Sequence, residues 1–311
     1  MPTLIVENSY GMAHETPPEH PERVARLTAV NAALSTPRFA QLHRCLAPIA
    51  EEAVLRLAHP QNYIDNIRDA IPNRGITPID ADTYTSAGSW NAALAGVGGC
   101  ITAVDTVLNG TAQNAFVATR PPGHHAERNR AMGFCLFSNI AIAARHALEN
   151  RGLERVAIID FDVHHGNGTQ DVMWDESRAL FISSHQMPLY PGTGAASEQG
   201  ASRNVLNVPL PPGSNGATMR RIYEDTIFPR LRAWNPDLIL VSAGFDAHAN
   251  DPLANLMWQA DDFAWITKGL CNVAADICQG RVVACLEGGY DTQALAESVT
   301  AHVAELMEHT T

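Results

Sequence analysis

Residues 156–168 read VAIIDFDVHHGNG, an apolar run of four residues followed at once by carboxylate and imidazole side chains. The run Val156–Ile159 is apolar at every position, which is typical of a strand buried on both faces of a parallel sheet. Short apolar runs of this kind recur at Leu4–Val6, Ala115–Ala118, Leu180–Ile182, Val205–Val208, Leu238–Val241 and Val282–Leu286. The sequence therefore predicts a sheet of buried, mostly parallel strands.

Helical patterns lie between these runs. Pro21 suits a helix start, and the hydroxyl of Ser138 can cap a second helix. We expect helices over residues 24–34, 139–148, 218–233 and 261–278. Strands that alternate with helices predict an α/β fold, an open, doubly wound, mostly parallel sheet flanked by helices. No repeat or linker divides the chain, so we expect a single domain over residues 1–311.

Polar side chains follow five of the apolar runs, at the point where each predicted strand ends. The five clusters are Arg120–His125, Asp160–Gly166, Ser183–His185, Ser242–Asp246 and Glu287–Tyr290. In open α/β sheets, ligands bind at the carboxyl ends of the strands. The sequence therefore predicts one functional site built from all five clusters.

Three of these side chains suit a metal ion. Asp162 and His164 are two residues apart in an extended segment, so they point to the same side, and Asp246 can join them from another strand end. Three protein ligands leave a position open for water or substrate, as in catalytic zinc sites. Two carboxylates and one imidazole also suit ferrous iron, so the ligand set leaves both metals open.

The tandem pair His124 and His125 is the second candidate centre. A histidine near a metal can take a proton from water and return it to a leaving amine. Asp160 and Asn167 are the candidate partners that would fix the two rings. Tyr290 follows two glycines, and its hydroxyl can donate a hydrogen bond to the oxyanion of a tetrahedral intermediate.

The composition limits the function further. With 46% apolar residues and a net charge of −12, the chain can form a large core but is poorly suited to nucleic acid. The acidic balance permits a cationic substrate or partner. The six cysteines form no C-x-x-C pair, which favours a reducing compartment. With no signal peptide and no apolar stretch near the length of a membrane span, we expect a soluble cytoplasmic protein without a membrane partner.

The motifs together resemble the histone deacetylase family, which has the arginase–deacetylase fold. The resemblance extends from His20 to Tyr290, and its most specific motifs are Arg120–His125, Asp160–Thr169 and Gly244–Asp246. Asn167 stands where class I enzymes usually have aspartate, and so resembles class II and bacterial deacetylase-like amidohydrolases. Shorter relatives that hydrolyse acetylpolyamines share most of this site.

The resemblance implies a role for each matching residue. It makes Asp162, His164 and Asp246 zinc ligands, His124 and His125 the acid/base pair, and Tyr290 the residue that polarises the carbonyl. It further implies a substrate tunnel, a structural potassium ion and an inner product channel. The tunnel residues are Gly133, Phe134 and Tyr190; at the position of Tyr190 many relatives have phenylalanine. The residues implied for potassium are Asp160, Asp162, His164, Ser183 and Ser184. The residue implied for the product channel is Arg23.

A single metal is expected. Arginase-like hydrolases share this sheet type but hold two metals, and they need further aspartates two residues beyond the first ligands. Those places read Gly166 and His248 here, so the second metal lacks its carboxylates.

Three hypotheses for function follow. The first is hydrolysis of N-acyl-lysine in proteins or peptides, which the apolar Leu253 favours, because specialised polyamine deacetylases can carry an acidic residue there. The second is hydrolysis of acetylpolyamines or other small acylated amines. The third is a binding module that keeps the fold without turnover, which the intact Tyr290 disfavours. A homo-oligomer is possible.

Overall fold

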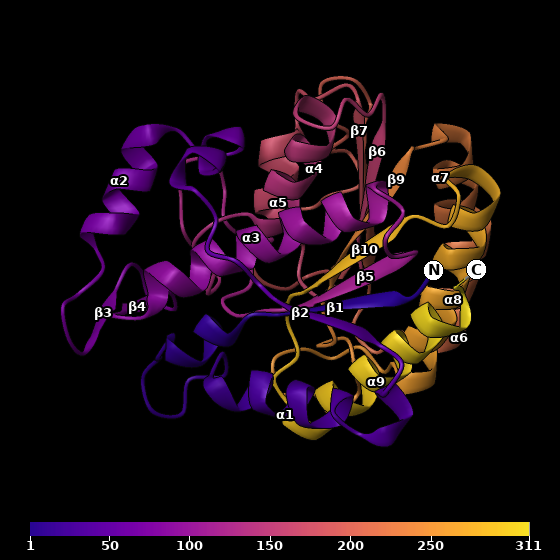
Figure 1. Ribbon diagram of the computed structural model, residues 1–311. Coiled ribbons are helices and arrows are strands. Elements are labelled where there is room, and N and C mark those ends of the chain that lie inside the picture. Colours follow the sequence, from indigo (N-terminus) through magenta and orange to yellow (C-terminus); the bar gives the residue numbers. More distant parts are fainter. Residues whose placement is uncertain (311) are drawn as a thin grey trace.

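The computed structural model describes residues 1–310, and its centre is an eight-stranded sheet (Figure 1). The strand order is β2-β1-β5-β10-β9-β6-β7-β8, and every neighbouring pair is parallel. The strands are β1 (Thr3–Glu7), β2 (His43–Leu46), β5 (Asn114–Ala118), β6 (Val156–Asp160), β7 (Ala179–Gln186), β8 (Val205–Leu210), β9 (Leu238–Ala243) and β10 (Val282–Leu286). This confirms the predicted α/β fold.

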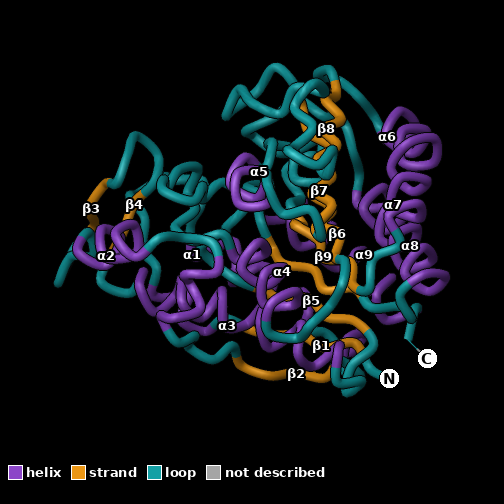
Figure 2. Tube along the Cα trace, turned by 90° about the horizontal axis from the view of Figure 1, so that it is seen from above, coloured by secondary structure: helices purple, strands orange, loops and turns teal. Residues whose placement is uncertain are grey.

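Helices cover both faces of the sheet (Figures 1 and 2). One face packs against α2 (Gln61–Asp69), α3 (Ser89–Leu108), α4 (Asn139–Glu149) and α5 (Asn167–Met173). The other packs against α1 (Val24–Leu34), α6 (Gly216–Ile222), α7 (Phe228–Trp234), α8 (Ala260–Ile277) and α9 (Thr292–Glu308). Alternate residues of the inner strands enter opposite core layers; Leu4 and Val6 of β1 join one layer, and Ile5 joins the other. Burial on both faces explains why the strands read as apolar runs.

The four predicted helices are present; α1 has the expected bounds, and the other three differ at their ends. The helix expected over 218–233 consists of α6 and α7, joined by a π-helical turn at Tyr223–Ile227. Pro21 lies before α1, whose N-cap is Arg23. Ser138 stands at the N-cap of α4, but its side chain makes no capping bond, so that prediction is wrong in its chemistry. The Ser138 N–H instead donates to Nε2 of His59, at 3.0 Å.

The helix α3 was not predicted. By length and hydropathy alone it could cross a membrane, contrary to the expectation that no stretch would. However, 67% of its most apolar window is buried within the fold, where it packs against β1, β5 and β10. The helix therefore forms part of the core of this domain.

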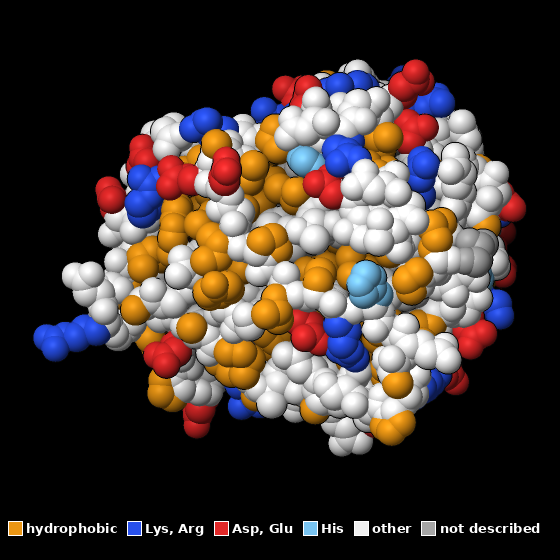
Figure 3. Space-filling model, viewed as in Figure 1, with side chains coloured by type: hydrophobic (Ala, Val, Ile, Leu, Met, Phe, Trp, Pro, Cys, Tyr) orange, Lys and Arg blue, Asp and Glu red, His pale blue; other side chains and the backbone are white. Residues whose placement is uncertain are grey.

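A β-hairpin outside the central sheet follows α2 in the chain. Its strands β3 (Ile76–Pro78) and β4 (Tyr84–Ser86) form an antiparallel hairpin. Figure 3 shows hydrophobic side chains gathered over α3 and its surroundings on this side of the molecule. The hairpin loop carries Asp82, which borders the site described below. The bounds expected for the domain, 1–311, stay a prediction.

Candidate metal and catalytic site

The register of the sheet brings the polar strand ends level with one another. Asp160, the last residue of β6, pairs with Ser183 of β7 on one side and Ser242 of β9 on the other. Two residues further along the chain, Asp162 faces the end of β10, where its Oδ2 accepts a hydrogen bond from the Gly288 N–H at 2.8 Å. The strand ends therefore form one continuous site.

Three potential metal ligands converge at this edge. Within residues 1–310, one group of three metal-binding side chains comes together, namely Asp162, His164 and Asp246, with their ligand atoms within 4.8 Å of one another. The His164 Nδ1 atom lies 3.1 Å from Oδ1 of Asp162 and 3.1 Å from Oδ2 of Asp246. Two ligands were expected from one segment and the third from another strand, and the three side chains are arranged in that way.

The donor set fits a divalent cation. Both carboxylates are fully buried, and one imidazole alone does not balance their two negative charges. Burial and the charge of Asp162 raise the pKa of the Asp246 carboxyl to about 7. A cation held by His164 and both carboxylates would neutralise this excess charge. The oxygen and nitrogen donors suit zinc and ferrous iron alike.

The two histidines of the tandem pair have different partners. Nδ1 of His124 lies 2.9 Å from Oδ2 of Asp160, whereas Nδ1 of His125 lies 2.7 Å from Oδ1 of Asn167. Burial alone would lower the pKa of His124, but Asp162 and Asp160 hold it well above its usual value. Burial, with His124 and His164 nearby, holds the pKa of His125 well below its usual value. The surroundings therefore favour the charged form of His124 and the neutral form of His125.

A buried glutamate supports the pair and was not predicted as a site residue. Oε2 of Glu287 accepts hydrogen bonds from the N–H groups of Gly123, at 2.7 Å, and His124, at 3.1 Å. Its Oε1 accepts one from the Ser242 hydroxyl. Glu287 was visible in the sequence as the first residue of the β10 cluster, but nothing there showed its contact with the turn that carries the histidines.

Tyr290 is buried in the site and held from three sides. Its N–H donates to Oδ2 of Asp251 at 2.7 Å, and its ring packs edge-on against Phe134 at 5.7 Å between centroids. The guanidinium of Arg26 lies 4.9 Å from the centre of the Tyr290 ring and donates to the Gly289 carbonyl. The expectation that Arg23 would serve the interior is wrong, because Arg23 is exposed and the buried arginine is one helical turn later.

A cavity of about 230 Å³ opens over these side chains. Its lining includes the predicted Gly133, Phe134, Tyr190 and Leu253, and it also includes Asp82 and Leu189, which were not predicted. A Cβ at Gly133 would lie 2.4 Å from the His125 ring, so only glycine allows the loop to approach so closely. His125, His164 and Tyr290 also line the cavity, together with Asp82, Gly133, Phe134, Leu189, Tyr190 and Leu253.

The residues expected to hold potassium lie at the ends of β6 and β7, and two of them, Asp162 and His164, also belong to the group of potential zinc ligands. Asp160 is adjacent to Ser183 across the sheet, and all of the expected side chains are buried. The Ser183 hydroxyl contacts Nδ1 of His185, and the Ser184 hydroxyl contacts the Tyr223 hydroxyl, each at 2.9 Å. These contacts neither require nor exclude a cation, so potassium stays a prediction.

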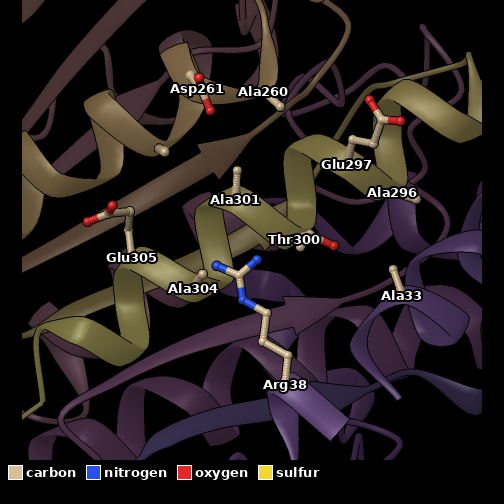
Figure 4. A pocket seen from close by; sticks show the side chains of 11 residues that line it. Ala33, Arg38, Ala260, Asp261, Ala296, Glu297, Thr300, Ala301, Ala304 and Glu305 are labelled. Atoms are coloured by element: carbon tan, nitrogen blue, oxygen red, sulfur yellow. The ribbon is translucent and has the colours of Figure 1, made fainter. Parts of the chain in front are cut away.

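A larger hollow lies away from the site, between α1, α8 and α9 (Figure 4). Alanines form most of its floor, and Arg38, Asp261, Glu297 and Glu305 lie around it. None of the predicted site residues lines it, so the chemistry is concentrated in the smaller cavity.

Comparison with known proteins identifies the family of this chain. Residues 19–306 match the model of the histone deacetylase domain. The histone deacetylase-like amidohydrolase of Pseudomonas aeruginosa is 38% identical over 276 residues, covering 88% of this chain and 72% of that protein. Chloroplastic histone deacetylase 14 of Arabidopsis thaliana is 39% identical, covering 95% of this chain and 74% of that protein.

A solved structure agrees with these relatives. The HD domain of HDA15 superposes with a TM-score of 0.93 at 32% identity, covering 99% of this chain and 88% of that one. The sequence match, the parallel sheet and the arrangement of the strand ends lead to one conclusion: the chain belongs to the histone deacetylase family, a family of deacetylase hydrolases.

Proposed function

We propose that this chain is a zinc-dependent amidohydrolase that removes acetyl or other acyl groups from N-acylated lysine. The observation that carries the proposal is the convergence of Asp162, His164 and Asp246 under a cavity that also exposes His125 and Tyr290. Family membership supports amide hydrolysis, and the donor set supports a divalent metal. Bound zinc would supply Lewis-acid chemistry, acidifying water and polarising the acyl carbonyl.

His125 would act as the general base. Its Nδ1 atom is engaged by Asn167, and the ring lines the cavity, so Nε2 is the atom available to the reactants. It would take a proton from the attacking water as the water oxygen bonds to the carbonyl carbon. It would then deliver that proton to the lysine nitrogen as the C–N bond breaks, releasing a carboxylic acid and a free amine. His124, whose charged form Asp162 and Asp160 favour, would stabilise the negative charge that develops.

Tyr290 would donate a hydrogen bond to the oxyanion. Burial raises its pKa well above the usual value, so the phenol keeps the proton it must donate. A preformed donor of this kind lowers the barrier because it need not reorganise during the reaction.

The cavity walls favour an acyl-lysine over a polyamine. Phe134, Leu189 and Leu253 give an apolar lining that suits the methylene stem of lysine. Asp82 and the net charge of −12 favour a second positive charge on the substrate, so acetylpolyamine hydrolysis is the second candidate.

A substrate comparison decides between the two. We expect kcat/KM for an acetyl-lysine peptide to exceed that for acetylputrescine and acetylspermidine. A preference for either polyamine of about tenfold, 1.4 kcal/mol, would reverse the assignment. A zinc-loaded chain that hydrolyses none of these, nor longer acyl or trifluoroacetyl lysines, would contradict both and favour a binding module.

We also propose a cellular compartment for the protein. The six cysteines are free, which supports a reducing compartment, and we propose the cytoplasm. The structural potassium ion and a homo-oligomer remain predictions, to be checked by ion analysis and by light scattering.

A further inference from the structure

A chain of hydrogen bonds continues outward from His125, beyond the partner that the sequence predicted. Oδ1 of Asn167 lies 2.7 Å from Nδ1 of His125. On its other side, the Asn167 amide nitrogen donates to Oε1 of Glu127 at 2.7 Å and to the Met132 sulfur at 3.3 Å. Each polar atom of the amide therefore has a partner.

We propose that Glu127 is a positioning residue which, by orienting the Asn167 amide, fixes His125 in the tautomer that carries its proton on Nδ1. The proposal rests on the proposed function, because that tautomer leaves Nε2 free as the base. Glu127 touches no reacting atom; it acts through Asn167.

The orientation of the Asn167 amide is fixed by which of the surrounding atoms can donate a hydrogen bond. An ionised carboxylate and a thioether sulfur only accept hydrogen bonds, so the amide nitrogen must face Glu127 and Met132. The amide oxygen then faces His125, and because that oxygen can only accept, Nδ1 must donate. A flipped amide would bring its oxygen to 2.7 Å from the Glu127 carboxylate, placing two acceptors against each other.

Glu127 is held in place independently of the amide. Its N–H donates to the Arg130 carbonyl at 2.9 Å, which closes a tight turn. The next residue, Arg128, donates from its N–H to Oδ2 of Asp171 at 2.8 Å and from Nε to the Asp171 carbonyl at 3.0 Å. Asp171 and Asn167 belong to the same helix, α5, so the glutamate and the amide are fixed relative to each other.

The arrangement also explains why asparagine suits position 167. His124 has the carboxylate of Asp160 as a direct partner, which favours its charged form. At His125 the nearest carboxylate of this chain of hydrogen bonds, that of Glu127, lies beyond Asn167. The ring therefore contacts a neutral amide, and Glu127 fixes the orientation of that amide. An aspartate at 167 would face Glu127, with two carboxylates at the distance of a hydrogen bond.

A charge-exchange cycle in the zinc-loaded protein tests the proposal. Asn167→Asp should lower kcat by about tenfold or more with KM little changed, since base catalysis contributes 10²–10⁴-fold. Adding Glu127→Gln should restore much of that loss, because the glutamine amide can donate to the new carboxylate. Glu127→Gln alone keeps an acceptor and should have a small effect, whereas Glu127→Leu removes the acceptor and should lower kcat by about tenfold.

The tautomer can be measured without turnover, by long-range ¹H–¹⁵N correlation in histidine-labelled protein. We expect the Nδ1–H form of His125 in the wild type and in Glu127→Gln, and a mixture in Glu127→Leu. Glu198→Leu is the matched control, because Glu198 accepts from the Gln170 amide in a parallel chain from His165. It should leave the His125 tautomer unchanged.

The outcomes separate this proposal from the proposed function. An unchanged tautomer and unchanged kcat in Glu127→Leu, or a double variant no better than Asn167→Asp, would overturn the role of Glu127. A wild type that hydrolyses no acyl substrate would overturn the proposed function, while a tautomer shift in Glu127→Leu would still support the positioning role.

Discussion

Tyr290 illustrates how the site fixes a single side chain. Its backbone is bound by Asp251, and its ring lies between the Arg26 guanidinium and the Phe134 ring. These contacts involve the backbone and the ring, and none of them involves the hydroxyl. The hydroxyl can therefore be removed without disturbing what positions the ring.

The variant Tyr290→Phe should for this reason lose activity but keep its structure. We expect kcat on an acetyl-lysine peptide to fall by about 10²–10³-fold, the effect of removing one oxyanion donor. Steady-state kinetics with zinc analysis measure this, and the zinc content should match the wild type. A kcat within twofold of the wild type would show that the hydroxyl has no role in the reaction.

At this scale the sequence predicted residue types well and their supporting contacts less well. Asp160 and Asn167 were named from sequence as the candidate partners of the two rings, because each ring needed one. The structure assigns them: Asp160 lies within hydrogen-bonding distance of His124, and Asn167 within that distance of His125. Glu127 was missed because it accepts a hydrogen bond from the amide of Asn167, and nothing in the sequence pairs a glutamate with an amide. Arg26 was missed although the bounds of α1 were predicted, because its partners, the Gly289 and Glu287 carbonyls, are far away in the sequence.

Among the secondary-structure elements, the ends of β9 and β10 closely approach the carboxylates that we propose as metal ligands. A Cβ at Gly288 would lie 2.1 Å from Oδ2 of Asp246 and 2.6 Å from Oδ2 of Asp162. At Gly244 a Cβ would lie 1.9 Å from Oδ2 of Asp162. Asp162, beyond the end of β6, and Asp246, beyond the end of β9, can approach each other only because glycine stands at positions 244 and 288.

The substitution Gly288→Ala should therefore damage the metal site. We expect less than one zinc per chain and a fall in kcat of about 10²-fold or more, because displacement of ligands by an ångström is costly. The control is Gly152→Ala, where the Cβ meets nothing within 4 Å but φ is +68°, so it should lose only about 1 kcal/mol of stability. Full zinc content in Gly288→Ala would contradict the close approach.

The start of α4 depends on a buried histidine. Nε2 of His59 accepts the hydrogen bond from the Ser138 N–H, and its Nδ1 lies 3.2 Å from the Arg128 carbonyl. Burial lowers the pKa of His59 to about 4, so the ring stays neutral where an exposed histidine would be charged. The bond at Ser138 also requires an unprotonated Nε2.

The free energy of unfolding should consequently depend on pH through His59. Between pH 6.5 and 4 the unfolded chain binds a proton that the folded chain does not, so stability is present above pH 6.5 and is lost as pH falls. The loss from this group is roughly 3 kcal/mol. Denaturant titrations should show a shallower acid loss in His59→Gln, whose amide can still accept from Ser138.

The exposed His43 of β2 offers the matched control. His43→Gln should retain the acid loss of the wild type. Identical pH dependence in the wild type and His59→Gln would contradict the role given to burial.

Elements were predictable where their pattern was strong. The strands were found because burial on both faces makes them apolar at every position. The helix α3 was missed because its middle, residues 92–101, has only small and apolar side chains, which weakens the helical period of the sequence. The edge strand β2 was missed because its residues are mostly exposed and include His43 and Arg44.

At the scale of the whole molecule, one topological fact organises the site. All eight strands run in parallel, so their carboxyl ends meet at one edge, and five of them carry the clusters that the sequence displayed. This explains how Asp162, Asp246 and Tyr290, the proposed ligands and hydrogen-bond donor, come together. The match of the histone deacetylase domain to residues 19–306 shows that the arrangement spans nearly the whole chain.

The measurement that tests this account most directly is zinc titration of the metal-stripped protein, with acetate release from an acetyl-lysine peptide as the readout. We predict no release without metal and recovery that is complete at one equivalent of zinc per chain, with no recovery in Asp246→Ala. Release that survives removal of the metal, or no release at any zinc loading, would contradict the central claim of a metal-dependent deacylase.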